Sequence, residues 1–357
     1  MPILDRDALN RAFALAERRV TAGELPFAIL AVAGADGLVR MEAYSQAGGT
    51  RLGSKAVCLL ASITKPIFAT LVLRLVADGR FSLEEPLARW LPELAEAGHA
   101  PFSAWHVLTH TTGIPDVDIE GLLLGGGTRD DVLRATIAAG QGSVPGSTFL
   151  YASSTFDLLA EAVTRATGRP YEELVSELVL EPLGMEDTGF EPFGVGVGRL
   201  APVQFGGSDG SRRPETATVP LDVAVRAFSA MHLAGAGLWS TASDLVRFGR
   251  AMLRGGELDG ARVLPPRIVE LMTREVTVDG LGAAEDRLLD GHYAIGWGKP
   301  GAASPASAAA FGHGGISGTR LWIDPAHDLV FVFLSGVWGL AGQVIDDQQL
   351  AVYAALR

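Results

Sequence analysis

The sequence is poor in cysteine. Its 357 residues contain a single one, Cys58. An intrachain disulfide is therefore impossible, and a metal site built from several thiolates is excluded. Cys58 lies in the apolar segment 57–60, which is typical of a small core residue rather than a reactive thiol.

Long apolar runs and blocks of like charge are also missing. No segment approaches the roughly 20 apolar residues that span a membrane, and residues 1–19 lack the apolar core of a signal peptide. The net charge of -12 disfavours nucleic acid as a partner, because an acidic surface repels phosphate. We therefore expect a cytoplasmic protein that acts on small molecules, with no membrane partner.

Lysine is scarce, with three in the chain, and one of them defines the first candidate site. Segment 61–66 reads Ala-Ser-Ile-Thr-Lys-Pro and precedes an apolar-periodic segment, which predicts a buried helix starting near Ser62. Ser62 and Lys65 then share a face, since residues three apart are neighbours on a helix. A buried lysine of lowered pKa can act as the base that a serine nucleophile needs. The alternative is an N-cap serine and a surface lysine, which the scarcity of lysine argues against.

The second candidate is Tyr151 in the segment Tyr-Ala-Ser, just before an expected helix over 154–167. A tyrosine in such a turn is often a packing residue. It can also exchange a proton with a substrate if a nearby ammonium stabilises its phenolate. Both interpretations stay open on local sequence alone.

The third candidate is the glycine-rich segment 311–318, read Phe-Gly-His-Gly-Gly-Ile-Ser-Gly. Glycines this dense before a strand allow a substrate to approach the backbone closely. The N–H of Ile316 could pair with that of Ser62 as an oxyanion hole. The alternative is a simple glycine-rich hairpin.

The expected elements predict an α/β fold of the α+β type, with a mainly antiparallel sheet flanked by helices. A hairpin signal, Gly-Ala-Asp-Gly at 34–37, separates two apolar runs. We expect a sheet domain from 1–80 plus 238–357 and an inserted, mostly helical domain over 81–237. The expected strands are 26–33, 38–44, 294–297, 319–323 and 328–334, and the expected helices are 5–22, 103–108, 129–139, 154–167, 171–179, 241–253, 264–275 and 344–356. A long loop is expected over 191–219.

Taken together, the ordered motifs resemble the serine beta-lactamase and penicillin-binding-protein superfamily. The closest resemblance is to its class C-like branch, which includes family VIII carboxylesterases and D-amino-acid peptidases. The motifs that carry it are 61–66, Leu-Thr-His-Thr-Thr-Gly-Ile-Pro at 108–115, Pro-Gly at 145–146 leading to Tyr151, Glu-Pro-Leu-Gly-Met at 181–185, Gly-Ala-Gly-Leu-Trp-Ser-Thr at 235–241, Gly-Trp-Gly at 296–298, and the His313 segment.

This resemblance implies roles for individual residues. Ser62 is the acylated nucleophile, Lys65 is its proton acceptor, and Tyr151 is the partner acid or base that also activates water. The strand motif Lys-Thr-Gly of the family is occupied here by His313, Gly314 and Gly315. No metal or organic cofactor is implied.

Two departures from the family pattern bear on the substrate. Ser153 stands where the tyrosine motif commonly ends in asparagine, so a contact to a substrate amide is weakened. His313 replaces the lysine of the strand motif, and a mostly neutral imidazole anchors a carboxylate poorly. We therefore expect a carboxylesterase of short acyl esters. The alternatives are hydrolysis of beta-lactams or D-amino-acid peptides, and a non-catalytic sensor that kept the fold.

Three other patterns are weaker. Segment 206–210 matches a Gly-x-Ser-x-Gly elbow but lies in a polar loop rather than between a strand and a helix. Segment 296–301 matches a dinucleotide fingerprint but has no following helix. His106 and His110 have helical ligand spacing without an evident third ligand.

Overall fold

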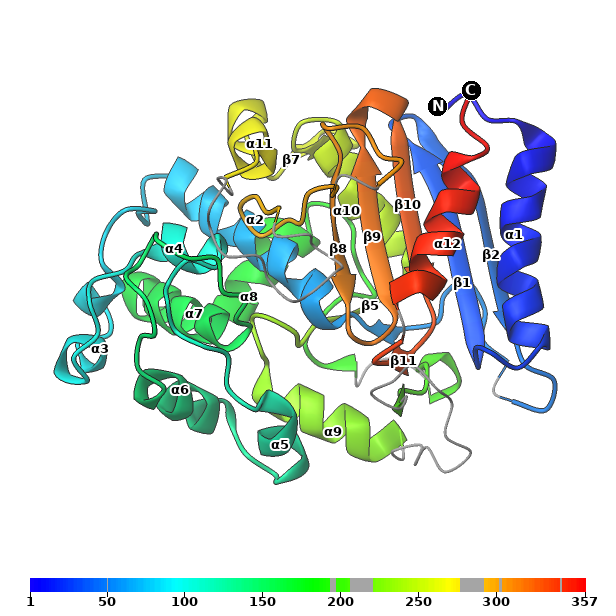
Figure 1. The fold of residues 1–357 in the computed structure, drawn as a ribbon. Helices are drawn as coiled ribbons and strands as arrows, with labels where there is room; N and C mark the ends of the chain where they lie inside the picture. Colours follow the sequence, from blue (N-terminus) through cyan, green and yellow to red (C-terminus); the bar gives the residue numbers. More distant parts are fainter. Residues whose placement is uncertain (50, 193–196, 206–220, 277–291, 302–303, 341) are drawn as a thin grey trace.

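The computed structural model describes residues 1–357 except 50, 193–196, 206–220, 277–291, 302–303 and 341 (Figure 1). Its main layer is a five-stranded antiparallel sheet in the order β2-β1-β10-β9-β8. The strands come from the two ends of the chain: β1 Phe27–Gly34, β2 Gly37–Ser45, β8 Phe311–Gly315, β9 Thr319–Asp324 and β10 Leu329–Leu334. The sequence-based expectation of a mainly antiparallel sheet flanked by helices is confirmed.

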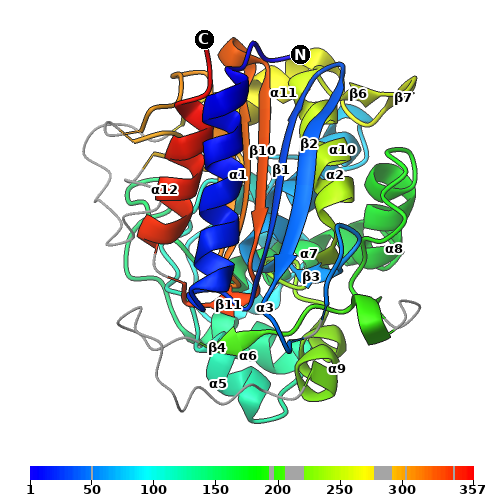
Figure 2. The same cartoon turned by 90° about the vertical axis from the view of Figure 1, so that its right-hand side faces the viewer.

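The sheet is covered on both faces. Helices α1 (Arg6–Thr21) and α12 (Gly342–Tyr353) lie side by side on one face, and α10 (Ala242–Leu253) covers the other (Figure 2). All eight residues of β1 are buried, and alternate ones enter two different apolar clusters. This explains why β1 reads as a continuous apolar run, since a strand needs alternating polarity only when one face meets water.

Local signals account for several boundaries. The side chain of Asp5 accepts hydrogen bonds from the first turn of α1, and Thr241 caps α10 in the same way. The predicted hairpin turn is present, with Gly34 pairing with Gly37. The predicted strands 319–323 and 328–334 are also present, as β9 and β10, joined by a 3-10 turn over Pro325–His327.

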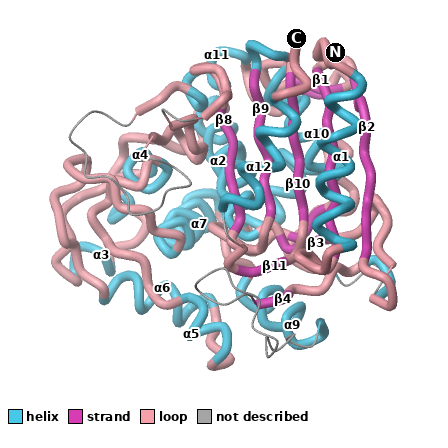
Figure 3. The backbone as a smooth tube through the Cα atoms, turned by 45° about the vertical axis from the view of Figure 1, so that its right-hand side comes forward, coloured by secondary structure: helices cyan, strands magenta, loops and turns pink. Residues whose placement is uncertain are grey.

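A mostly helical part lies beyond the β8 edge of the sheet (Figures 1 and 3). Helix α2 (Thr64–Ala77) packs between this part and the sheet, and it is buried along nearly its whole length. The other helices are α3 Glu93–Glu96, α4 Ala104–Leu108, α5 Ile119–Leu124, α6 Arg129–Ala138, α7 Ser154–Thr167, α8 Tyr171–Val175, α9 Leu221–Met231 and α11 Pro266–Thr273. The domain boundaries at residues 80 and 237 stay a prediction.

Three pairs of two-residue strands complete the fold. They are β3 Cys58–Leu59 with β5 Trp239–Ser240, β6 Glu257–Leu258 with β7 Ala261–Arg262, and β4 Gln204–Phe205 with β11 Val337–Trp338. Within the described residues, no helix has both the length and the apolar character that crossing a membrane requires.

Some expectations were wrong. Residues 294–297 form a tight turn rather than a strand: the N–H of Ala294 donates to the carbonyl of Trp297, and Gly296 has a φ of +71°. Strands and turns can both contain apolar side chains, so the apolar run 294–297 could not distinguish a strand from a turn. Helix α8 ends at Val175 and continues as a π-helical turn. The short helices α3 and α5 and the 11-residue helix α9 were not expected, and the described part of the 191–219 loop contains β4.

Candidate active site

Ser62 lies in a 3-10 turn, Ala61–Ile63, that leads directly into α2. The segment just before this turn is fixed by the β3–β5 pair and by the N–H of Leu60, which donates to the carbonyl of Leu238. Ala61 has a φ of +48°, a left-handed conformation that costs a non-glycine residue energy. Such strain persists only where the surroundings impose it, and it is frequent next to catalytic groups.

Lys65 projects from the first turn of α2 and is completely buried. Its Nζ lies 3.0 Å from Ser62 Oγ, 2.9 Å from Ser153 Oγ and 2.9 Å from the carbonyl oxygen of Gly235. Burial lowers the pKa of Lys65 to about 7, and the carboxylates of Asp116 and Asp157 oppose this shift. The amine is therefore able to gain and lose a proton near neutral pH.

Tyr151 is the second group that contacts Ser62. Its hydroxyl donates a 2.9 Å hydrogen bond to Ser62 Oγ. Its ring packs against the imidazole of His110 at 4.3 Å between centroids with a tilt of 33°, and Lys65 Nζ lies 4.7 Å from the ring centre. The structure thus brings Ser62, Lys65 and Tyr151 together at hydrogen-bond distance, as triads of nucleophile, base and orienting group require.

One arrangement of the hydrogen bonds of a neutral Lys65 amine suits proton transfer from Ser62. The Gly235 carbonyl can only accept, so it takes one N–H, and Ser153 Oγ can accept the other. The lone pair then faces Ser62, whose hydroxyl can donate to it while accepting from Tyr151. This arrangement prepares Ser62 to lose its proton to Lys65.

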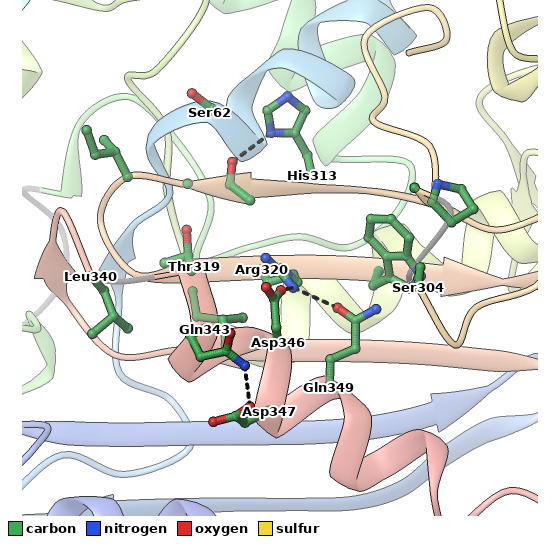
Figure 4. Close-up of a pocket in the computed structure, with 18 of the residues that line it drawn as sticks. Ser62, Ser304, His313, Thr319, Arg320, Leu340, Gln343, Asp346, Asp347 and Gln349 are labelled. Atoms are coloured by element: carbon green, nitrogen blue, oxygen red, sulfur yellow. Dashed lines mark hydrogen bonds and ion pairs between the residues drawn. The ribbon is translucent and has the colours of Figure 1, made fainter. Parts of the chain in front are cut away.

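His313 lies on strand β8 near Ser62 (Figure 4) and ends a buried hydrogen-bonded chain. The N–H of Ala152 donates to His110 Nδ1, so His110 Nε2 carries the proton that faces the hydroxyl of Tyr293 at 3.3 Å. The Tyr293 hydroxyl lies 3.0 Å from His313 Nε2, and His313 Nδ1 lies 2.7 Å from the Gly314 carbonyl. Burial lowers the pKa of His313 to about 3, so its ring is neutral and both nitrogens are engaged.

The turn after β8 is fixed against the segment that precedes Ser62. The hydroxyl of Ser317 donates to the Leu59 carbonyl at 2.7 Å, and that of Thr319 donates to the Leu60 carbonyl at 3.0 Å. A Cβ on Gly315 would lie 2.1 Å from the Leu60 carbonyl oxygen, so only glycine allows this approach. The backbone of Ile316 is held beside the nucleophile, and its role as an oxyanion donor stays a prediction.

A cavity of about 820 Å³ opens at these residues. Its wall on the Ser62 side includes the predicted substrate-binding residues Ser153, His313, Gly314, Gly315 and Ile316. Figure 4 shows Ser62 and His313 on one side of β8 and the side chains of α12 on the other. There the nearly buried Arg320 donates to Asp346 at 2.5 Å and to Gln349 at 3.0 Å.

Several residues of the site were missed in the sequence. The carboxylate of Asp116 accepts the backbone N–H groups of Ser153 and Ser154, both at 2.9 Å, and so orients the end of the tyrosine motif. Tyr293 was not singled out, because it joins two histidines that belong to separate motifs and one of them lies 183 positions away. Asp157 could have been recognised from the sequence as a buried carboxyl group, because it lies in the otherwise apolar segment 156–159.

The weaker patterns have different outcomes. Segment 206–210 lies outside the described residues. Segment 296–301 begins in the turn at Gly296 rather than between a strand and a helix. His106 Nδ1 accepts the N–H of Ser103, whereas His110 bonds Ala152 and Tyr293, so the two rings have separate partners.

Comparison with known proteins agrees with this geometry. The beta-lactamase family profile matches residues 13–355. Esterase EstB from Burkholderia gladioli is 32% identical over 339 residues, covering 83% of this chain and 81% of that protein. The D-alanyl-D-alanine-carboxypeptidase/endopeptidase AmpH from Escherichia coli K12 is 30% identical over 158 residues, which cover 41% of each chain.

A solved structure shares the fold over nearly its full length. EstCE1, described as a hydrolase with promiscuous acyltransferase activity, superposes with a TM-score of 0.78 at 21% identity, covering 98% of this chain and 99% of that one. The profile match, the relatives and the shared fold lead to one conclusion. This chain belongs to the beta-lactamase family of serine hydrolases.

Proposed function

We propose that this protein is a carboxylesterase that hydrolyses short acyl esters through an acyl-enzyme on Ser62. The observation that carries the proposal is the convergence of Lys65 Nζ and the Tyr151 hydroxyl on Ser62 Oγ, at 3.0 and 2.9 Å. A base with a pKa of about 7 suits catalysis at neutral pH, because it is both available and strong enough to accept a proton.

The proposed reaction has two halves. Ser62 Oγ attacks the ester carbonyl carbon while its proton moves to the Lys65 amine, and the N–H groups of Ser62 and Ile316 stabilise the oxyanion. The bond to the alcohol oxygen then breaks, and that oxygen takes a proton through Tyr151. Water attacks the acyl-enzyme in the second half, giving its proton to the same groups and releasing the acid and free Ser62.

The preference for uncharged esters is supported by the state of His313. A buried ring with a pKa of about 3 carries no charge at neutral pH, and its two nitrogens already bond Tyr293 and Gly314. It therefore has no N–H left to donate to a substrate carboxylate. The likeness to esterase EstB is consistent with this preference.

Hydrolysis of beta-lactams or D-amino-acid peptides is a second candidate, favoured by the likeness to AmpH. The two candidates separate by substrate. We expect turnover of p-nitrophenyl butyrate at a kcat/KM at least about 100-fold above that for a chromogenic cephalosporin, since the cephalosporin brings a carboxylate without a cation from His313. The opposite ratio would favour the second candidate.

The nucleophile is tested by intact mass after treatment with a fluorophosphonate, for the wild type and Ser62→Ala, beside p-nitrophenyl butyrate turnover. We expect one adduct and turnover in the wild type and neither in the variant. Turnover that survives Ser62→Ala would overturn the mechanism. An adduct without turnover of any acyl donor would favour the sensor hypothesis.

A further inference from the structure

Asp157 is a buried carboxyl group that the proposed reaction does not use. It lies on α7, its side chain is completely buried, and the charged side chains near it include Lys65 of α2 and Arg129 of α6. Burying a carboxylate is costly unless hydrogen bonds or charges compensate it. Burial raises the pKa of Asp157 to about 7, against the effect of Arg129. The contacts of Asp157 should therefore show why a carboxyl group is buried at this position.

Its contacts lead to the catalytic lysine in two steps. Asp157 Oδ1 accepts the backbone N–H of Ala234 at 2.9 Å. The carbonyl oxygen of the next residue, Gly235, lies 2.9 Å from Lys65 Nζ. Segment 234–235 is thus held at one end by Asp157 and contacts Lys65 at the other.

The segment has little freedom to move on its other side. A Cβ on Gly235 would lie 2.7 Å from the carbonyl oxygen of Ser153, so the backbone is pressed against the tyrosine motif. Two residues later, the N–H of Gly237 donates to the Leu233 carbonyl and closes a tight turn. The carbonyl of Gly235 is therefore aimed by its neighbours, and the side chain of Asp157 fixes the start of this turn.

We propose that Asp157 is a positioning residue for the catalytic amine: it holds segment 234–235 so that the Gly235 carbonyl takes one N–H of Lys65 and leaves the lone pair facing Ser62. The inference rests on the roles proposed above for Ser62 and Lys65. The geometry of an amine matters here because a proton acceptor works only when its lone pair points at the proton.

Other groups near Asp157 define the controls. Arg129 Nε lies 3.8 Å from Asp157 Oδ1, and Arg129 Nη1 lies 3.5 Å from Glu161, one helical turn along α7. Asp157 Oδ2 has no hydrogen-bond partner within the described part of the chain. The ionisable groups near Asp157 include Arg129, Lys65, Asp116 and Tyr171, and those near Lys65 also include His110, Tyr151 and His313.

Three variants of the full chain test the proposal. Asp157→Leu removes the acceptor, and Asp157→Asn keeps an oxygen acceptor but removes the charge. Glu161→Gln removes the charge of a carboxylate that pairs with Arg129 and Arg165 but does not contact Lys65 or segment 234–235. Each is compared with the wild type by kcat and KM on p-nitrophenyl butyrate. The rate of fluorophosphonate labelling, followed by intact mass from about pH 5.5 to 9.5, reports the reactivity of Ser62 without any ester substrate.

We expect Asp157→Leu to lower kcat and the labelling rate about 10- to 100-fold while KM changes less than about twofold. Asp157→Asn should keep kcat within about threefold, and the acidic limb of its pH profile should move only slightly to lower pH, because a partly ionised carboxyl that favours the protonated amine is gone. Glu161→Gln should behave as the wild type.

The proposal is overturned if folded Asp157→Leu labels at the wild-type rate, if Asp157→Asn is as damaged as Asp157→Leu, or if Glu161→Gln is equally damaged. Should Asp157→Leu fail to fold, Asp157→Ala replaces it: the same loss of kcat and labelling rate supports the proposal, and labelling at the wild-type rate contradicts it. Labelling without ester turnover would refute the esterase function alone, since the comparison of labelling rates remains valid.

Discussion

Two buried polar groups flank Ser62, and they are partnered in different ways. On one side the Lys65 amine meets three oxygens, two of which belong to hydroxyl groups that can donate as well as accept. On the other side the chain through His110, Tyr293 and His313 uses each ring nitrogen in one directed hydrogen bond.

Burial acts on both groups, with different consequences. It lowers the pKa of Lys65 to about 7 and that of His313 to about 3. The ordinary pKa of a lysine is high enough for desolvation to bring it close to neutral pH, whereas desolvation takes the pKa of a histidine well below neutral pH. This difference supports the proposed role of Lys65 in proton exchange, whereas His313 stays neutral with both ring nitrogens engaged.

The largest expected effect is that of Lys65→Met, which removes the amine at similar size. We expect kcat/KM on p-nitrophenyl butyrate to fall about 10³- to 10⁴-fold, as for loss of a general base. A fall of less than about tenfold would show that a group other than Lys65 accepts the Ser62 proton.

The same variant has a consequence for stability. The pKa of Lys65 is about 7 in the folded protein, whereas the ordinary value for a solvated lysine is 10.5. Between these values the unfolded chain binds a proton that the folded protein does not, so wild-type stability should rise with pH there. The slope relative to Lys65→Met should be about 1.4 kcal/mol per pH unit, measured by urea unfolding at several pH values above neutrality.

The pH profile of the wild type should distinguish Lys65 from His313. A protonated Lys65 cannot accept the Ser62 proton, so kcat/KM should rise about tenfold per pH unit below the pKa of about 7 and level off above it. His313 should contribute no limb, since it stays neutral above about pH 3. A flat profile between about pH 5 and 8 would argue against Lys65 as the base.

A smaller effect is expected for Ser153→Ala, which removes one of the three oxygens around the amine. Loss of one hydrogen bond of about 1 kcal/mol should lower kcat about fivefold. Ser153→Asn places an amide oxygen nearby and should recover part of the loss. The control is Ser147→Ala, an exposed serine whose hydroxyl donates to the Val144 carbonyl and whose loss should leave kcat unchanged.

The smallest effect on activity is expected for Tyr293→Phe. The change leaves the facing nitrogens of His110 and His313 without the hydroxyl, so the free energy of unfolding should fall by about 1–3 kcal/mol. We expect kcat/KM to change only about twofold, because the groups that move protons are untouched. Tyr44→Phe, at a half-buried tyrosine far along the sheet, is the control. A loss of activity above about 100-fold would place the histidine chain in the proton path.

The sequence predicted much of the fold because the relevant signals are local. The hairpin at 34–37, the cap of α10 and the strand pair around Pro325–His327 depend on turn and capping residues that act within a few positions. The turn at Gly296 was missed because a short apolar run does not distinguish a turn from a strand. Helix α9 was missed although its buried residues Val225, Phe228 and Met231 recur at helical spacing.

The pairing of Ser62 with Lys65 could be predicted from the sequence alone, because a spacing of three places both on one helical face. The partners of these two residues depend on the folded chain. Tyr151, 86 positions beyond Lys65, contacts Ser62, and the Gly235 carbonyl contacts Lys65 from a segment that Asp157 holds. Folding also buries His313 and so keeps it neutral. The physical reason is that desolvation and hydrogen-bond partners set the protonation state of a side chain, and both depend on segments that only folding brings together.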